Sequence, residues 1–526
     1  MAGAILKAAA VAAVAGLVPA SAHAAQWSQT AAATYSWHVN TNWDTNPNPY
    51  PTGAGITVDV NNDIAGNQII NLPNSTIGLI SVGTLNLGDS NATNSFTLSS
   101  NTLVLDNGAN PAAINKTGNG ASAVARDSFN AITLRLDSDL VVTANATDSS
   151  VANGLIRFQS AINNGINGAK GLTKEGNGLI LLNVANGYTG PTIIKGGRIN
   201  IEGGSNTNVI NGNVEIQPGA TLRANGAHNV ILDTAAMSFT GATNATGSFY
   251  NPGFNGTTLI SETIGGLEGT VHATEIGGGV GTFTFGGDNQ NRTFNGRFGN
   301  TTSYTKAGTG VQTLGGSLHS FQNSVSRNFN VLGGRVDLNK DAGVTSIAQS
   351  NLNIGDGTQS GASRPAVRLL QSDQIAVRTF TGTPTETTAV TLNSGVFETA
   401  GNDEAVGSLA LAGSGFNTID LGTGGSVLNF LAPGTWSATA LLEILNWSDA
   451  STASGLDQLF IGSSAVLTPE QLAAMSFVNP EGYAPGTYGA TQLATGEVVA
   501  AVPEPTALAL VGLGGITLLG RRTRRN

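Results

Sequence analysis

Oxygen-bearing side chains near the start of the chain have the spacing of cation ligands. Asp59, Asn61 and Asp63 alternate along the sequence, as ligands do in the first half of a calcium-binding loop. Ile64 stands where such a loop has its turn glycine, and Ile70 stands where it has its bidentate glutamate. Ordinary turn chemistry is therefore the favoured interpretation, and a weak cation site is the alternative.

Two pairs of carboxylates have types and spacing suited to cleavage of a sugar polymer. Asp137 with Asp139, and Asp403 with Glu404, could act as acid and base or assist a calcium-dependent lyase. A spacing of two residues on a strand predicts that Asp137 and Asp139 share one outward face. We favour the alternative that these carboxylates belong to a solvated acidic face.

Other catalytic signals are missing from the sequence. The five histidines are dispersed, there is no cysteine, and no nucleophile elbow, P-loop or dinucleotide-binding fingerprint occurs. We therefore predict no catalytic residue and no cofactor. Four aromatic residues could stack on sugar rings or, as we favour, fill corners of the fold: Tyr188, Tyr250, Phe254 and Tyr304.

The charge of the chain argues against two classes of partner. Only 11% of residues are charged and the formal net charge is -10. Lys7 and the arginines at the C-terminus supply part of the positive charge, so the body is still more acidic. This balance disfavours binding to nucleic acid or anionic lipid and suits cations or neutral glycans.

The C-terminal segment combines three elements in a fixed order. Pro503, Glu504 and Pro505 are followed by an uncharged stretch over 506–520 and by a basic tail over 521–525 that begins with Arg521 and Arg522. Prolines keep the first element out of a helix. The second would span roughly 22 Å as a helix, short for a hydrocarbon core of about 30 Å. The arginines would remain cytoplasmic.

This arrangement resembles the PEP-CTERM sorting domain. The resemblance implies processing by an exosortase-type membrane enzyme, and the family occurs commonly in Gram-negative bacteria that secrete polysaccharide. It further implies transient anchoring in the inner membrane and delivery to the cell surface or the extracellular space. A permanent single-pass anchor is the alternative.

The N-terminus has the features of a secretory signal peptide. An apolar run over 4–20 follows Lys7 and the amino terminus, and Ala22 and Ala24 fit the small-x-small rule of signal peptidase. We predict cleavage after Ala24. An N-terminal transmembrane helix is the alternative.

Short alternating apolar runs bounded by Gly, Asn or Asp predict many short strands between these two ends. The segment 173–178 (TKEGNG) is echoed at 305–310 (TKAGTG) and partly at 115–120, and 196–201 (GGRINI) is echoed at 333–338 (GGRVDL). Stacked copies of such a unit can bury a continuous apolar stripe. The sequence therefore predicts an all-β solenoid.

These copies resemble the autotransporter-associated β-strand repeat. Residues 172–201 form the better copy and 304–338 a degenerate one. The resemblance implies a right-handed parallel β-helix. An autotransporter would end in a β-barrel translocator, whereas this chain ends in a sorting tail, so we expect a general secretion route.

The expected organisation follows from these features. The segments are a signal helix at 1–24, an aromatic-rich N-terminal cap at 25–51, a parallel β-helix at 52–433, a C-terminal cap and linker at 434–501, and a sorting signal with a short transmembrane helix at 502–526. The favoured function is that of an exported structural or adhesive protein associated with exopolysaccharide. The alternative is a secreted polysaccharide lyase or glycoside hydrolase.

Overall fold

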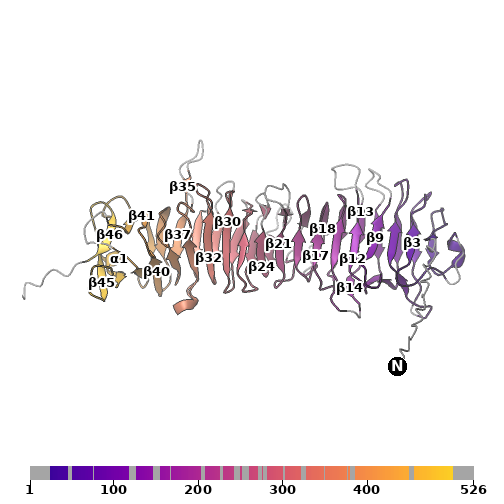
Figure 1. The fold of residues 1–526 in the computed structure, drawn as a ribbon, viewed down its shortest axis with the longest axis horizontal. Helices are drawn as coiled ribbons and strands as arrows, with labels where there is room; N and C mark the ends of the chain where they lie inside the picture. The colour runs from indigo at the N-terminus through magenta and orange to yellow at the C-terminus, as the bar shows by residue number, and fades with distance from the viewer. Residues whose placement is uncertain are drawn as a thin grey trace, which may run out of the picture.

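The structure is a long rod of stacked short strands (Figure 1). It is a computed structural model. The described residues are 24–44, 50–74, 76–117, 126–145, 155–165, 168–202, 208–225, 229–241, 249–251, 260–269, 275–276, 281–299, 302–321, 327–348, 350–375, 377–378, 386–448 and 455–501. Strands dominate this part of the chain, which confirms the predicted all-β class.

Parallel pairing between successive coils arranges the strands in ladders that run along the rod. The first ladder consists of β1 (Ala25–Gln26), β3 (Thr57–Val60), β6 (Thr84–Leu87), β9 (Ala112–Lys116), β12 (Leu140–Thr143), β15 (Leu172–Glu175), β17 (Thr192–Ile194), β19 (Val214–Ile216), β21 (Ala236–Phe239), β24 (Gly266–Gly269), β27 (Arg292–Phe294), β30 (Val311–Gly316), β32 (Arg335–Lys340), β34 (Ala366–Leu369), β38 (Val396–Glu398), β40 (Phe416–Asp420), β42 (Leu441–Leu445) and β44 (Met475–Val478).

Three further ladders form the other sides of the rod. The second ladder consists of β2 (Thr34–Ser36), β4 (Gln68–Asn71), β7 (Phe96–Ser99), β10 (Asp127–Asn130), β13 (Leu155–Phe158), β16 (Leu179–Leu182), β18 (Arg198–Glu202), β20 (Thr221–Asn225), β22 (Phe249–Asn251), β25 (Glu275–Ile276) and β28 (Arg297–Phe298). The third ladder consists of β5 (Ile80–Val82), β8 (Thr102–Leu105), β11 (Thr133–Leu136) and β14 (Ile162–Asn164). The fourth ladder consists of β23 (Ile260–Thr263), β26 (Gly281–Phe285), β29 (Thr302–Lys306), β31 (Asn328–Val331), β33 (Asn351–Ile354), β37 (Ala389–Leu392), β39 (Glu404–Leu411), β41 (Val427–Trp436) and β43 (Gln458–Ile461).

Alternation along each strand separates the core from the surface. In β3, Val58 and Val60 are fully buried, and their counterparts on neighbouring coils join one apolar cluster that extends along the rod. Asp59 points the other way, where its carboxylate accepts a hydrogen bond from Asn86, and Asn86 accepts one from Asn115. Period-two patterning thus gives each coil an apolar inner side and a polar outer side. The long parallel ladders fit a β-solenoid.

The repeated glycine motifs form equivalent turns around buried lysines. Lys174 Nζ donates to the carbonyl oxygens of Glu175, Gly176 and Gly196, at 2.6, 2.8 and 3.3 Å. The left-handed turn at Gly176, with φ of 74°, brings its carbonyl toward the ammonium.

The second copy of the motif repeats this arrangement 132 residues later (306 minus 174). Lys306 Nζ donates to the carbonyls of Ala307, Gly308 and Gly333, at 2.5, 3.1 and 3.3 Å. Lys116, in the partial copy, instead forms a buried ion pair with Asp127 at 2.5 Å. The sequence repeat therefore corresponds to a repeated structural device.

Aromatic side chains close the N-terminal end of the rod. The Trp43 ring meets those of Trp27 and Trp37 edge-on at centroid distances of 5.0 and 4.9 Å, and all three are buried. The indole N–H of Trp27 donates to the Gln68 side chain, that of Trp37 to the Pro51 carbonyl, and that of Trp43 to the Trp37 carbonyl. A short 3-10 helix, η1 (Asn40–Asn42), completes this end.

Antiparallel strands end the ladders at the other end of the rod. β45 (Thr487–Gln492) pairs with β44, and β46 (Glu497–Ala500) pairs with both β43 and β45. A short helix, α1 (Pro469–Ala473), lies before β44, and Thr468 and Gln471 form a capping box at its start. The change of pairing direction covers strand edges that another coil would otherwise use.

Three remaining elements project from the rod (Figure 1). β35 (Val377–Arg378) and β36 (Glu386–Thr387) form an antiparallel pair outside the ladders, and η2 (Gly361–Ser363) lies in the loop between β33 and β34. Among the described residues, no helix has the length and apolar character needed to cross a membrane. The expected signal helix, apart from Ala24, and the expected anchor at 506–520 lie outside these residues.

Candidate functional site

Charged side chains line up on the outer face of the first ladder between β32 and β40. The strand register places Asp337 beside Arg368, Arg368 beside Glu398, and Glu398 beside Asp420. A neighbouring outward column holds Arg335, which is in register with Ala366 and, through it, with Val396. Parallel pairing brings these residues together although each belongs to a separate coil.

Ion pairs hold the side chains of this surface in place. Arg335 donates from both Nε and Nη2 to the two carboxylate oxygens of Asp337, at 2.6 and 3.1 Å. This hydrogen bonding raises the pKa of Arg335. Arg368 Nε lies 3.7 Å from Glu398 Oε2.

The Glu398 carboxyl has a perturbed proton affinity. Burial raises its pKa, while Arg335 and Arg368 act in the opposite direction. The nearby carboxylates of Asp420 and Asp337 add to the increase. The competition between burial and two arginines gives Glu398 a proton affinity above that of an ordinary glutamate.

The loop that contains η2 stands over this face and is fixed by Arg364. Arg364 donates from Nε to the Gly361 carbonyl at 3.3 Å and from Nη1 to the Phe416 carbonyl at 2.9 Å. Gly361 has a φ of 62°, in the left-handed region that favours glycine. Arg364 thus connects the projecting loop to strand β40, 52 residues further along the chain.

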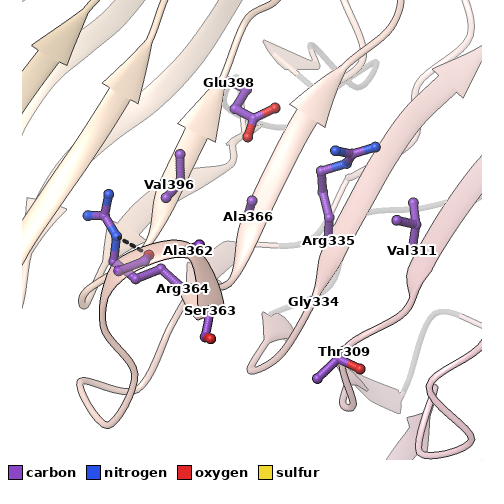
Figure 2. Close-up of a pocket in the computed structure, with 11 residues that line it drawn as sticks. Thr309, Val311, Gly334, Arg335, Ala362, Ser363, Arg364, Ala366, Val396 and Glu398 are labelled. Atoms are coloured by element: carbon purple, nitrogen blue, oxygen red, sulfur yellow. Dashed lines mark hydrogen bonds between the residues drawn. The ribbon is translucent and has the colours of Figure 1, made fainter.

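A hollow of about 480 Å³ lies between this loop and the first ladder (Figure 2). Its lining combines apolar side chains of Val311, Ala366 and Val396 with the charged groups of Arg335 and Glu398. Figure 2 shows Arg335 and Glu398 on neighbouring parts of the sheet, with Ala362, Ser363 and Arg364 on the loop beside them.

A second hollow, of about 350 Å³, shares Gly361 and Arg364 with the first. Its most prominent feature is Phe416, which is 52% exposed and in register with the exposed Leu441. Hydrogen-bonding side chains line the same hollow: Gln359, Ser360, Ser394 and Glu443. An exposed aromatic ring with polar groups around it suits the apolar face and hydroxyl edge of a sugar.

The residues proposed from sequence as cation ligands bind amide groups instead. Asp59 accepts from Asn86 at 2.6 Å, Asn61 from Gln26 at 2.9 Å, and Asp63 from Asn91 at 2.5 Å. Each interaction joins one coil to a neighbouring coil. In the described ranges, no cluster of three or more His, Cys, Asp or Glu residues has the arrangement of a metal site.

The expectation that Asp137 and Asp139 share an outward strand face is wrong. Both lie in the corner between β11 and β12, where alternation no longer applies. Asp137 is buried and is held in a bidentate interaction by Arg135, at 3.1 and 2.8 Å. Asp139 is exposed and accepts from the Gly171 amide at 2.8 Å. The two carboxylates therefore have separate structural partners.

Asp403 and Glu404 also have separate environments. Asp403 is exposed and accepts from the Val427 amide at 2.7 Å. Glu404 is buried and accepts from the amides of Gln374 and Ile375 at 2.7 and 3.1 Å. Burial raises the pKa of Glu404 to about 8. Its role is to satisfy backbone donors inside the rod.

Two of the aromatic residues considered as sugar platforms lie inside the rod. Tyr188 and Tyr304 are fully buried, and their hydroxyls bond to Thr192 and to the Gly299 carbonyl. They fill the interior, as the preferred interpretation predicted. The Tyr250 side chain and the whole of Phe254 lie outside the described part of the chain.

Sequence reasoning missed the hollows on the first ladder. In the sequence, Arg335 and Asp337 stood out only as members of the repeated motif at 333–338. Their spacing of two residues on a strand was the one signal that they share a face. Arg364, Glu398 and Phe416 come from separate segments of the chain, so no local motif joins them.

The all-β fold with its long parallel ladders is compatible with a β-solenoid, and its surface carries two hollows, one of them lined by the exposed Phe416. Residues 501–525 match the PEP-CTERM protein-sorting motif. The motif indicates an exported protein that is sorted to the cell surface and processed by an exosortase-type enzyme. No curated protein matches the chain, and no solved structure does. The proposed processing residues, Ala22 and 503–522, lie outside the described part of the chain.

Proposed function

We propose that this protein is a structural and adhesive component of the cell surface or extracellular matrix, and that it binds exopolysaccharide. The observation that carries the proposal is the pair of hollows around Arg364, where the exposed Phe416 ring lies among polar side chains. A sugar can stack on that ring while its hydroxyls bond to Gln359 and Glu443.

The rod supports an adhesive role because its binding surface is carried by rigid elements. Register and core packing fix the outer face of the first ladder, and Arg364 fixes the loop above it. A site held this way loses little conformational entropy when it binds a polymer. The amide ladder from Asp59 through Asn86 to Asn115 gives a polar exterior elsewhere.

We further propose that the coil is right-handed and that its repeats are of the autotransporter-associated type. Parallel crossovers are right-handed in most proteins. The equivalent contacts of Lys174 and Lys306 support a shared repeat unit. Signal peptidase would cleave after Ala24, and the segment at 506–520 would anchor the chain in the inner membrane before processing.

A polysaccharide lyase or glycoside hydrolase is the second candidate, and one observation favours it. Arg335, Arg364 and Glu398 line one hollow, and the raised pKa of Glu398 suits a general acid. We rank this candidate second because glycoside cleavage needs two carboxylates with separate roles. Glu398 is flanked by Arg368, and the nearby Asp337 is held by Arg335, so the described residues of the hollow offer no second carboxylate with a free role.

Replacement of Phe416 by alanine tests the adhesive proposal. We expect the purified exported protein to bind one or more neutral polysaccharides, and the variant to bind roughly tenfold more weakly because a stacking contact is lost. Ile69→Ala is the matched control, since Ile69 is 42% exposed on β4, far along the rod. Equal affinity of the two variants would contradict the proposal.

The same purified protein distinguishes an adhesive protein from a polysaccharide-cleaving enzyme. Incubation with each bound polysaccharide should leave its chain length unchanged, as measured by size-exclusion chromatography. Shortening of a polymer that disappears in Glu398→Gln would support the lyase or hydrolase instead.

A further inference from the structure

An arginine-rich surface lies on the second ladder, on a different sheet from the hollows. Arg157, Arg198 and Arg223 occupy outward positions of β13, β18 and β20, because their strand neighbours Ile156, Ile199 and Leu222 all belong to the core. The overall charge of -10 gives no hint of such a concentration of positive charge.

The strand register fixes the spacing of these arginines. Arg198 pairs with Thr221, and Asn200 with Arg223, so the two arginines are diagonal neighbours on adjacent coils. Their Cα atoms are thus about 8 Å apart, from a strand separation of ~4.8 Å and a two-residue offset. Arg157 lies in the same column as Arg223, three strand separations or about 14 Å along the rod.

These guanidinium groups have few protein partners. The Nε atoms of Arg157, Arg198 and Arg223 are shielded from solvent and have no hydrogen-bond partner among the residues that the structure describes. Arg157 lies 3.9 Å from Glu202, whereas Arg198 and Arg223 make no ion pair within the described ranges. The Asn200 side-chain oxygen, located between them in register, likewise has no partner within the described ranges.

The charges of Arg198 and Arg223 favour an anionic ligand at this surface. Burial lowers the pKa of Arg198, and the positive charge of Arg223 lowers it further. The like charges of Arg198 and Arg223 repel each other, and an anion that contacts both removes this repulsion. Each guanidinium offers a planar fork of N–H donors that matches a carboxylate or a sulfate.

The protein surface next to the arginines is apolar. Leu179 and Leu181 of β16 are nearly fully buried, yet they form a cluster separate from the central core, because they lie on the outward side of the strand. In register, Leu179 is next to Arg198, and Leu181 is between Arg157 and Asn200. The methylene groups of arginine can cover such a surface while the charged end remains available.

We propose that Arg198 and Arg223, extended by Arg157, bind the acidic groups of an anionic polysaccharide that runs along the rod. The row extends over four adjacent strands, so a polymer can meet several arginines in succession. A single small anion would gain little at a half-exposed pair in water, whereas a polymer adds linked contacts. This inference deepens the proposed association with polysaccharide and rests on it, but it concerns a separate surface.

The nature of the polymer follows from charge. Carboxylate and sulfate groups share the planar or forked acceptor geometry that arginine recognises. A densely phosphorylated nucleic acid would be repelled by the acidic body of the protein, with its net charge of -10. We therefore expect a sugar polymer of moderate charge density.

The test compares the exported protein with the double variant Arg198→Gln/Arg223→Gln. Binding to immobilised polygalacturonate and to chondroitin sulfate, two polymers of moderate charge density, is measured by biolayer interferometry at low and high salt. The control, Lys170→Gln/Arg327→Gln, removes the same charge from other surfaces, and circular dichroism verifies the fold of every variant. We expect the double variant to bind at least about tenfold more weakly than the control at low salt.

Several results would overturn the proposal. One is equal binding by the double variant and the control, and another is that the unaltered protein binds neither polyanion. A third is inhibition by inorganic sulfate or galacturonate monomer that is as effective as inhibition by the polymer. The fourth is tighter binding of duplex DNA than of either polysaccharide. Phe416→Ala should leave polyanion binding unchanged, so a failure of this site is distinguishable from a failure of the neutral-glycan site. Arg198→Lys/Arg223→Lys should give intermediate affinity, because lysine keeps the charge and loses the fork.

Discussion

Replacing Lys174 by methionine removes the ammonium group around which the best copy of the repeated turn is built. Methionine keeps the length and apolar stem of the side chain but donates no hydrogen bond. The carbonyls of Glu175, Gly176 and Gly196 then lose a common donor that lies 2.6, 2.8 and 3.3 Å away. We expect the turn between β15 and β16 to be destabilised.

The magnitude follows from three opposing contributions. A hydrogen bond to a charged group stabilises by about 1.5–3 kcal/mol, which gives several kcal/mol for three bonds. Burial lowers the pKa of Lys174 to about 8, so desolvation of the ammonium offsets part of this gain. Water can also reach the carbonyls at this turn once the lysine is gone. We therefore expect a net loss of about 3 kcal/mol.

Lys195→Met is the matched control for this experiment. Lys195 belongs to the adjacent turn, but its side chain is 46% exposed and forms a surface ion pair with Glu175 at 2.9 Å. Such a pair contributes about 0–1 kcal/mol. Urea unfolding followed by circular dichroism, with hydrogen exchange of the amides in β15–β18, measures both variants. If Lys174→Met were no more destabilising than Lys195→Met, the turn lysine would not have the role that we assign to it.

Two further predictions concern pH and processing. Burial raises the pKa of Glu404 to about 8, so between about pH 4.5 and 8 the native state binds more protons than the unfolded chain. The stability that protonated Glu404 contributes is therefore complete below about pH 4.5 and is lost as the pH rises through 8. Glu404→Gln should flatten that decline in urea titrations, and an unchanged slope would refute the assignment. Replacing Glu504 and Pro505 by alanines should leave a longer membrane-associated form in immunoblots, unlike the matched Thr495→Ala; an unchanged mature mass would contradict it.

Local patterns in the sequence were sufficient to predict the class of fold. Alternation such as that in 132–136 indicated the strands, and the Lys-Glu-Gly-Asn-Gly turn at 174–178 marked the corners. Both signals depend on neighbours within a few residues, where side-chain direction and backbone preference decide the outcome. The PEP-CTERM match likewise rests on a contiguous segment, 501–525.

The corners were less predictable than the strands. Asp137 and Asp139 have the spacing of a shared strand face, yet the chain turns between β11 and β12 and separates their side chains. Asp59 and Asp63 have the spacing of cation ligands, but amides from neighbouring coils bind them. For Asp59, Asp63 and Asp139, a partner 27, 28 or 32 residues away decided a role that the residue's own neighbours did not indicate.

By itself, the sequence determined the strand-rich class, the repetition of glycine-rich motifs and the signal for sorting to the cell surface. Only the tertiary structure decided which outward side chains meet, as Arg364 meets the carbonyl of Phe416 and as Arg198 comes beside Arg223. The physical reason is that neighbours across a ladder are set by the number of residues in each coil. Turns and loops of unequal length fix that number, and no local pattern of residue types records it.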